Sequence, residues 1–102
     1  MSEEIKSAAV AEVKKVTSPN GVFITLYDSK TEVYSKPTLA GNNADALRQF
    51  GILVNDRNGS LVSMHPEDFT LFRIGSLEGF TLIPEERQAL ANGVDVKLPE
   101  AN

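Results

Sequence analysis

The stretch GVFITLYD, Gly21–Asp28, decides the fold because it is the clearest strand signal in the chain. Residues 22–27 are all β-branched, aromatic or aliphatic, and turn-forming residues flank them on both sides. Apolar side chains fall on both faces of this run. The pattern therefore predicts a central strand of a sheet.

A shorter run, EVYSKP, follows the turn residues DSKT and ends at Pro37. Proline cannot donate to a sheet ladder, so it favours an edge position. We expect this run to form an edge strand in a hairpin with the first strand.

The segment NNADALRQFGILVND predicts the main helix. Positions i, i+3, i+4 and i+7 hold its apolar stripe: Leu47, Phe50, Gly51 and Val54. Asn42 or Asn43 can cap its start, because a side-chain oxygen there accepts from a free amide of the first turn. Asn58 and Gly59 can end it, because both tolerate the left-handed conformation.

The stretch HPEDFTLFRIG, His65–Gly75, predicts a corner that leads into a buried strand. Pro66 fixes the backbone of the corner, and the carboxylates of Glu67 and Asp68 can accept from the amides that follow. Beyond it we expect strands over residues 69–77 and 80–83, joined at Gly79, and a short final helix over residues 85–93.

The segments predict three parts along the chain. Residues 1–21 form an extension, in which residues 2–16 have the capping and charge pattern of a helix, although residues 13–17 could instead form a strand. Residues 22–93 form a single domain, and residues 94–102 a loose tail. The predicted fold class is α+β: a small antiparallel sheet of about four strands, one main helix packed across it, and weak terminal helices.

Composition restricts the classes of function. A chain of 102 residues, 41% hydrophobic and 24% charged, supports one globular domain. The absence of cysteine excludes disulfides and thiolate metal sites and favours the cytoplasm. No run is long and apolar enough to span a bilayer, so no membrane partner is expected. The net charge of -4 argues against strong non-specific binding to nucleic acid.

The sequence shows no catalytic constellation. His65 is the one histidine, and no nucleophile or set of converging ligands accompanies it. His65, Pro66, Glu67 and Asp68 are therefore interpreted as a structural turn. No phosphate-binding loop or serine nucleophile motif is present, and we expect no enzyme activity, no metal and no cofactor.

Single-stranded nucleic acid is bound by cations along a groove and by aromatic faces on which bases stack. The phenylalanines are more simply explained as core residues. The candidate DNA-binding residues are Lys30, Tyr34, Lys36, Arg48, Arg57 and Arg73.

Three stretches in order, FITLYDSKTEVYSKP, NADALRQFGILVND and HPEDFTLFRIGSLEG, resemble the small nonstructural protein of gokushovirus-type microviruses, the single-stranded DNA phages related to the Chlamydia phages. The resemblance covers about Phe23–Gly79. Met64 departs from it, since a lysine is common before the His-Pro-Glu-Asp turn in that family.

The resemblance implies a phage accessory protein in the host cytoplasm that is absent from the mature virion and acts in viral single-stranded DNA synthesis or packaging. Our hypothesis is that it acts by binding DNA. The alternative is an adaptor or self-assembling module that contacts viral or host replication proteins, or another copy of itself, without touching nucleic acid. If the six candidate residues do not converge on one face, the DNA site at those residues loses its physical basis.

Overall fold

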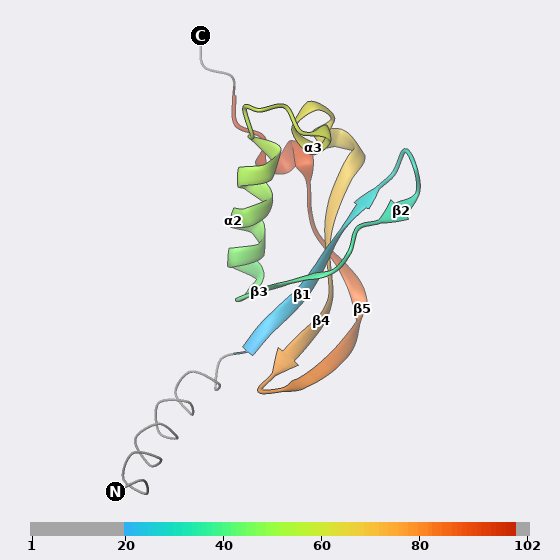
Figure 1. Cartoon of the computed structure of the whole chain (residues 1–102), viewed down its shortest axis with the longest axis vertical. Helices are drawn as coiled ribbons and strands as arrows, with labels where there is room; N and C mark the ends of the chain where they lie inside the picture. Colours follow the sequence, from blue (N-terminus) through green and yellow to red (C-terminus); the bar gives the residue numbers. More distant parts are fainter. Residues whose placement is uncertain (1–19, 100–102) are drawn as a thin grey trace, which may run out of the picture.

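The computed structural model of the chain describes residues 20–99, which form a curled antiparallel sheet with one main helix beside it (Figure 1). The predicted α+β class is confirmed. The helix predicted over residues 2–16 lies outside the described residues. The elements in chain order are β1 Asn20–Asp28, β2 Val33–Tyr34, β3 Thr38–Ala40, α2 Asn43–Val54, α3 Leu61–Met64, the 3-10 turn η1 Pro66–Asp68, β4 Phe69–Glu78, β5 Thr81–Asn92 and α4 Gly93–Val96.

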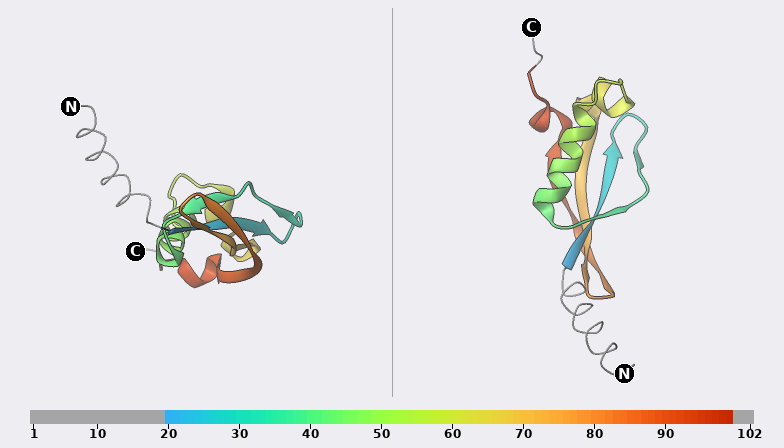
Figure 2. Two further views of the ribbon diagram at one scale, coloured as in Figure 1. Left: turned by 90° about the horizontal axis from the view of Figure 1, so that it is seen from below. Right: turned by 60° about the vertical axis from the view of Figure 1, so that its left-hand side comes forward.

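The strands follow the order β2-β1-β4-β5, and β3 pairs with β1 on the same side as β2. The predicted central strand is β1, which pairs with β4 along its whole length. Alternate residues of β1 are buried on the side of α2, among them Val22 and Ile24. The opposite face of the sheet is called the open face below. The two further views in Figure 2 show the curl of the sheet and α2 lying along one side of it.

The last strand, β5, corrects the prediction of a helix over residues 85–93. Backbone pairing with β4 continues from Glu78↔Thr81 to Thr70↔Asn92, with two irregularities, and overrides the helical preference of EERQALAN. Pro84 does not interrupt the strand, because β5 is the outer strand of the order and Pro84 lies at an irregularity opposite Gly75. Gly75 is required there, since a Cβ would come within 2.8 Å of the Ile83 carbonyl oxygen.

Helix α2 begins as predicted and ends earlier than predicted. The Asn42 side chain accepts from the amide of Asp45 at 2.8 Å, which satisfies a free donor of the first turn. The helix then ends at Val54, with Asn55 rather than Asn58 or Gly59 as its cap. The side chain of Asn55 donates back to the Gly51 carbonyl at 2.8 Å, which explains the earlier end.

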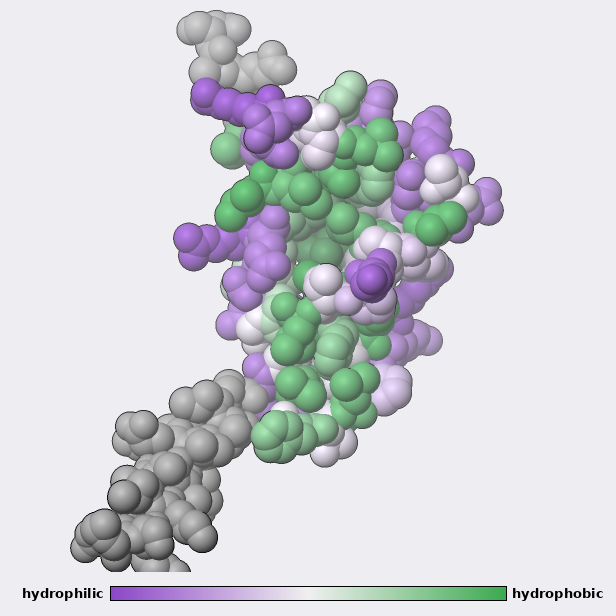
Figure 3. All heavy atoms as spheres, in the orientation of Figure 1, coloured by the Kyte–Doolittle hydropathy of each residue, from purple (hydrophilic) through white to green (hydrophobic). Residues whose placement is uncertain are grey.

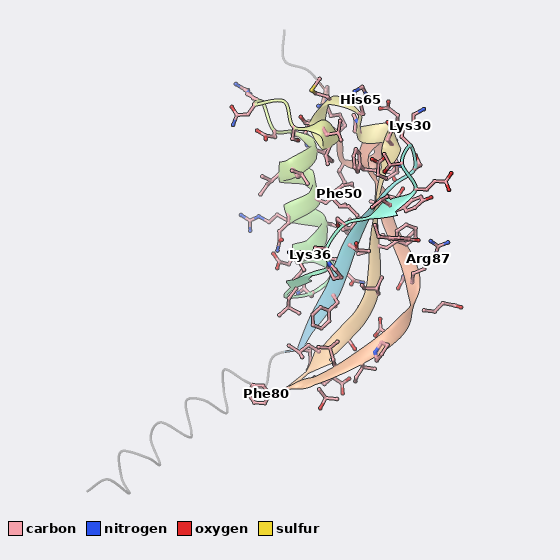
Figure 4. The ribbon with its side chains drawn as sticks, turned by 45° about the vertical axis from the view of Figure 1, so that its right-hand side comes forward. Lys30, Lys36, Phe50, His65, Phe80 and Arg87 are labelled. Carbon is pink, nitrogen blue, oxygen red and sulfur yellow. The ribbon has the colours of Figure 1, made fainter. Side chains whose placement is uncertain are left out.

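Ala46, Phe50 and Val54 are the buried residues of α2, and Figure 4 shows Phe50 directed toward the sheet. Together with residues of β1, β3, β4 and α3 they form the core, which comprises Val22, Ile24, Ala40, Ala46, Phe50, Val54, Val62, Phe69 and Leu71. No helix among residues 20–99 is long and apolar enough to cross a membrane.

The segment that begins at residue 94 does not behave as the loose tail that we predicted. Val96 of α4 packs against the core, and Asn55 holds the segment through bonds to the Val96 carbonyl at 3.0 Å and the Leu98 amide at 2.8 Å. Gly93 lies against η1 so closely that a Cβ would overlap the backbone of Pro66. The end of the folded unit is therefore fixed by contacts between residues distant in sequence.

Candidate functional site

The six candidate DNA-binding residues do not share one surface. Lys30 lies in the turn between β1 and β2, and Tyr34 lies in β2. Arg48 lies on the side of α2 away from the buried residues, and Arg57 follows that helix in an exposed loop. Cations at such separate places cannot follow one strand of phosphates, so no single site contains all six.

Lys36 belongs to a different part of the surface from Lys30, as Figure 4 shows. It lines a cavity of about 240 Å3 between α2 and the sheet, whose walls include Ile24, Phe50 and Leu71. The cavity is lined mainly by side chains that belong to the core or pack against it. Lys36 lines it, and none of the other candidate cations does.

Arg73 binds two neighbouring elements of the fold through its guanidinium. Its Nε and Nη2 donate to the two carboxylate oxygens of Glu85 at 2.7 and 3.0 Å, and its Nη1 donates to Asn43 Oδ1 at 3.0 Å. The hydrogen bonds from Arg73 lower the pKa of the Glu85 carboxyl, and the same bonds raise the pKa of Arg73. This guanidinium joins β4, β5 and the start of α2, and three of its five N–H donors are used in these contacts.

A different group of side chains does converge, on the open face of the sheet. Tyr27 and Tyr34 are direct neighbours across β1 and β2, with ring centroids 4.7 Å apart. Phe72 on β4 lies 6.4 Å from the Tyr27 ring and 6.1 Å from the Tyr34 ring. Arg87 on β5 completes the group, which we call the aromatic cluster: Tyr27, Tyr34, Phe72 and Arg87.

Arg87 covers the rings from the far strand of the sheet. Its guanidinium carbon lies 5.0 Å from the centre of the Phe72 ring and 5.9 Å from that of Tyr34, which are cation–π distances. Its Nη1 also donates to the hydroxyl of Tyr34. Because β2 and β5 are the two ends of the strand order, this contact requires the sheet to curl around the aromatic cluster.

Among the residues that the structure describes, Arg87 differs from Arg73 in having no carboxylate partner. Within residues 20–99, the pair between Arg73 and Glu85 is the one ion pair. Arg87 is exposed beside the rings of Tyr34 and Phe72. A planar cation held over aromatic faces can donate hydrogen bonds to a phosphate, and the rings beside it offer a surface on which bases stack. This combination is typical of single-strand recognition.

The turn formed by His65, Pro66, Glu67 and Asp68 has a structural arrangement of its own. The Asp68 amide donates to the His65 carbonyl at 3.0 Å, while the Asp68 and Glu67 carbonyls accept from the Ser29 amide and the Asn92 side chain. The carbonyls, rather than the predicted carboxylates, thus provide the acceptors of these bonds.

In this turn one ligand atom each of His65, Glu67 and Asp68 lies within 4.8 Å of the others. This is a spacing that a metal ion could bridge. His65 and Glu67 are exposed, however, and exposed acidic groups often lie this close without an ion. The distances alone do not assign a metal here.

A family model described as "Phage ORF5 protein" matches residues 22–96, more than half of the chain. The chain belongs to this phage protein family. The phage origin implied by the resemblance is therefore confirmed at the level of the family. No curated protein and no solved structure matches the chain.

The family match runs from Val22 in β1 to Val96, the last residue of α4. It contains the whole sheet except Asn20 and Gly21, and every member of the aromatic cluster. Of these four residues, Tyr34 alone was among the DNA-binding candidates predicted from the sequence. Arg87 was missed because residues 85–93 were predicted to be a helix, and Phe72 because it was assigned to the core although it is half-buried. Alternating residues in a recognised β5 would have placed Arg87 on the face of Phe72.

Proposed function

We propose that this Phage ORF5 family member is a non-enzymatic accessory protein of a gokushovirus-type microvirus that binds single-stranded DNA during viral DNA synthesis or packaging. It would act in the host cytoplasm and be absent from the mature virion. The family match and the ordered resemblance support the phage context. The aromatic cluster supports the binding activity.

The observation that carries the proposal is the convergence, from four strands, of three rings and a guanidinium that has no carboxylate partner in the described part of the chain. Stacking of a base on an aromatic ring contributes about 1–3 kcal/mol, and every base has a face that can stack. Tyr34, 41% exposed, offers the most accessible ring. Arg87 beside it can donate to a phosphate or stack on a base.

The acidic balance of the chain limits the form that this binding takes. With a net charge of -4, the protein cannot rely on many phosphate contacts for affinity. Binding should therefore depend on stacking, favour single strands over duplex, and weaken only moderately with salt. A duplex keeps its bases stacked on one another and offers no free face to these rings.

The proposal is tested by fluorescence anisotropy with a labelled single-stranded oligonucleotide, with a duplex of the same sequence as control. We expect Tyr34→Ala and Arg87→Ala each to weaken single-strand binding by about tenfold or more, as loss of one stacking contact predicts. Arg48→Ala, which removes an exposed cation from the outer side of α2, is the matched control and should leave the affinity unchanged. Equal losses in all three variants, or no binding by the wild type at low salt, would reject the aromatic cluster as the site.

An adaptor or self-assembling module is the second candidate function, and a specific observation favours it. Phe80, which was predicted to be a core residue, is 89% exposed at the tip of the β4–β5 hairpin. Leu82, two residues further along the chain in β5, is 62% exposed, and neighbouring exposed apolar groups are typical of protein interfaces. In this case the partner is a viral or host replication protein, or a second copy of the chain, and Tyr34→Ala would leave partner binding intact.

A further inference from the structure

The open face carries a second group of side chains, at the opposite end from the aromatic cluster. Residues paired directly across antiparallel strands point to the same face, and so do residues two apart on one strand. Leu39 pairs with Phe23, Gly21 pairs with Leu77, and Leu77 pairs with Leu82. These register positions define the apolar patch, which consists of Phe23, Leu39, Leu77 and Leu82.

The close approach of Leu39 to Gly21 agrees with this register. A Cβ on Gly21 would come within 2.9 Å of Leu39 Cδ1, so Leu39 lies across the Gly21 backbone. The neighbouring positions Val22, Ala40 and Ser76 are buried on the opposite face, beneath α2. At this end of the sheet, one face is therefore buried, while the open face, which carries the apolar patch, is uncovered.

The apolar patch is open to solvent. Leu39 is 50% exposed and Leu82 is 62% exposed, while Phe23 and Leu77 are half-buried. Figure 3 shows apolar side chains gathered at this end of the sheet. A single exposed leucine is ordinary, but a continuous apolar surface across four strands is expected to be covered by something.

The start of the described chain lies beside the patch. Asn20, the first residue of β1, pairs with Glu78, and the next pair is Gly21 with Leu77 of the patch. Figure 4 shows Phe80 at the hairpin tip, at this same end of the sheet. Residues 1–19 therefore join the fold at the edge of the apolar surface, so a contact with it requires no long connection.

The sequence of residues 1–19 has the chemistry that this surface requires. The segment SEEIKSAAVAEVKKV was predicted to form a helix, with a stripe of apolar residues at Ile5, Ala8, Ala9, Val13 and Val16. Small side chains permit close packing against a sheet. Lys14 and Lys15, near the join, also match the acidic Glu78 beside it.

We propose that the N-terminal segment 1–19 covers the apolar patch of its own chain through this apolar stripe. The occupant is part of the same molecule, held at high effective concentration by direct connection to β1. The aromatic cluster at the other end of the open face remains accessible. The segment thus completes the fold without closing the surface proposed to bind DNA.

The absence of cysteine in the chain permits a direct test. A single thiol introduced by Lys6→Cys, on the polar side of the segment, takes a nitroxide spin label in the full-length protein. We expect the label to broaden the methyl NMR signals of Leu39, Leu77 and Leu82 selectively. The methyl signals of Ile52, which is 66% exposed on the outer side of α2, should remain sharp.

A second experiment separates the segment's own chain from a second copy. Isotope-labelled protein without the nitroxide is mixed with unlabelled protein that carries it, so that any broadening in the mixture arises between molecules. Broadening in the mixture equal to that in the singly labelled chain would overturn the proposal in favour of a dimer. Equal broadening of the patch and Ile52, or none at all, would show that the segment has no fixed place on the sheet.

Substitutions in the patch provide the matched control. Leu82→Ser lies on an exposed outer strand and should remain folded, yet it should reduce the broadening at Leu39 and Leu77. Ile52→Ser removes a similarly exposed side chain from α2 and should leave the broadening unchanged. If the two variants behave alike, the contact is not made through the apolar patch.

Discussion

Gly93→Ala is the substitution that tests the C-terminal part of the fold most directly. A Cβ at this position would overlap the carbonyl oxygen and carbon and the Cα atom of Pro66, all of them backbone atoms that cannot rotate away. Either α4 or η1 must move, which strains the packing of Val96 and the bonds from Asn55. Overpacking of this kind costs about 1–3 kcal/mol, and each hydrogen bond lost adds about 1 kcal/mol.

We therefore expect Gly93→Ala to lower the free energy of unfolding by about 2–4 kcal/mol, and Tm by about 10–20 °C for a domain of this size. Urea unfolding followed by circular dichroism measures this loss. Gly51→Ala is the matched control, since Gly51 lies within α2 with nothing within 4 Å of its Cβ position. It should raise the free energy of unfolding by about 0.5–1 kcal/mol through helix propensity.

A Gly93→Ala variant as stable as the wild type would refute this reasoning. It would mean that α4 does not rest on Pro66 and that residues 94–102 form the loose tail predicted from the sequence. A loss of stability in Gly51→Ala as well would indicate that the fold tolerates added methyl groups poorly at any glycine. The loss in Gly93→Ala could then not be attributed to the contact with Pro66. The two glycines have to respond in opposite directions.

Three further substitutions test the remaining contacts by urea unfolding. Glu85→Gln should be less stable than the wild type at neutral pH, and the difference should vanish as the pH falls through the lowered pKa of Glu85, because the carboxylate then loses the charge that binds Arg73; a difference that does not change with pH would contradict this. Asn55→Ala should cost about 1–3 kcal/mol, because it removes the cap of α2 and the bond to Val96 together; a loss below 0.5 kcal/mol would remove this residue as a link. Leu71→Ala should cost about 2–5 kcal/mol, since this side chain is 2% exposed at the centre of the core; a smaller loss would place it outside the core.

The parts of the fold that the sequence could predict are those with strong local signals. The apolar run of β1 and the spacing of Phe50 and Val54 in α2 each indicate one structure over many residues. The Asn42 cap is equally local. Strand β5 has no such signal, because EERQALAN favours a helix in isolation and becomes a strand through its pairing with β4. Tertiary context overrides local propensity there.

The candidate site was harder to predict for the same reason. Which cations share a surface depends on how the elements pack, and that information is not present in their spacing. Arg73 and Arg87 look alike in the sequence. Arg73 is bound to Glu85 and Asn43, while Arg87 covers aromatic rings and has no acidic partner between residues 20 and 99. Both arrangements require β5 to lie beside β4. One wrong secondary-structure assignment therefore hid both the pairing of Arg73 with Glu85 and the position of Arg87.

The open face of the sheet has two ends of different chemistry, and this difference bears on how many partners it has. The aromatic cluster includes phenol hydroxyls and a guanidinium, so it can contact a hydrated polyanion at little desolvation cost. The apolar patch contains hydrocarbon side chains alone, which gain nothing from phosphates but gain about 25 cal/mol per Å2 when another apolar surface covers them. A single ligand would match the chemistry of one end and leave the other end without a suitable partner. The two proposed occupants, DNA at the cluster and the N-terminal segment at the patch, would together match both ends. The anisotropy and spin-label experiments can reject either proposal without affecting the other.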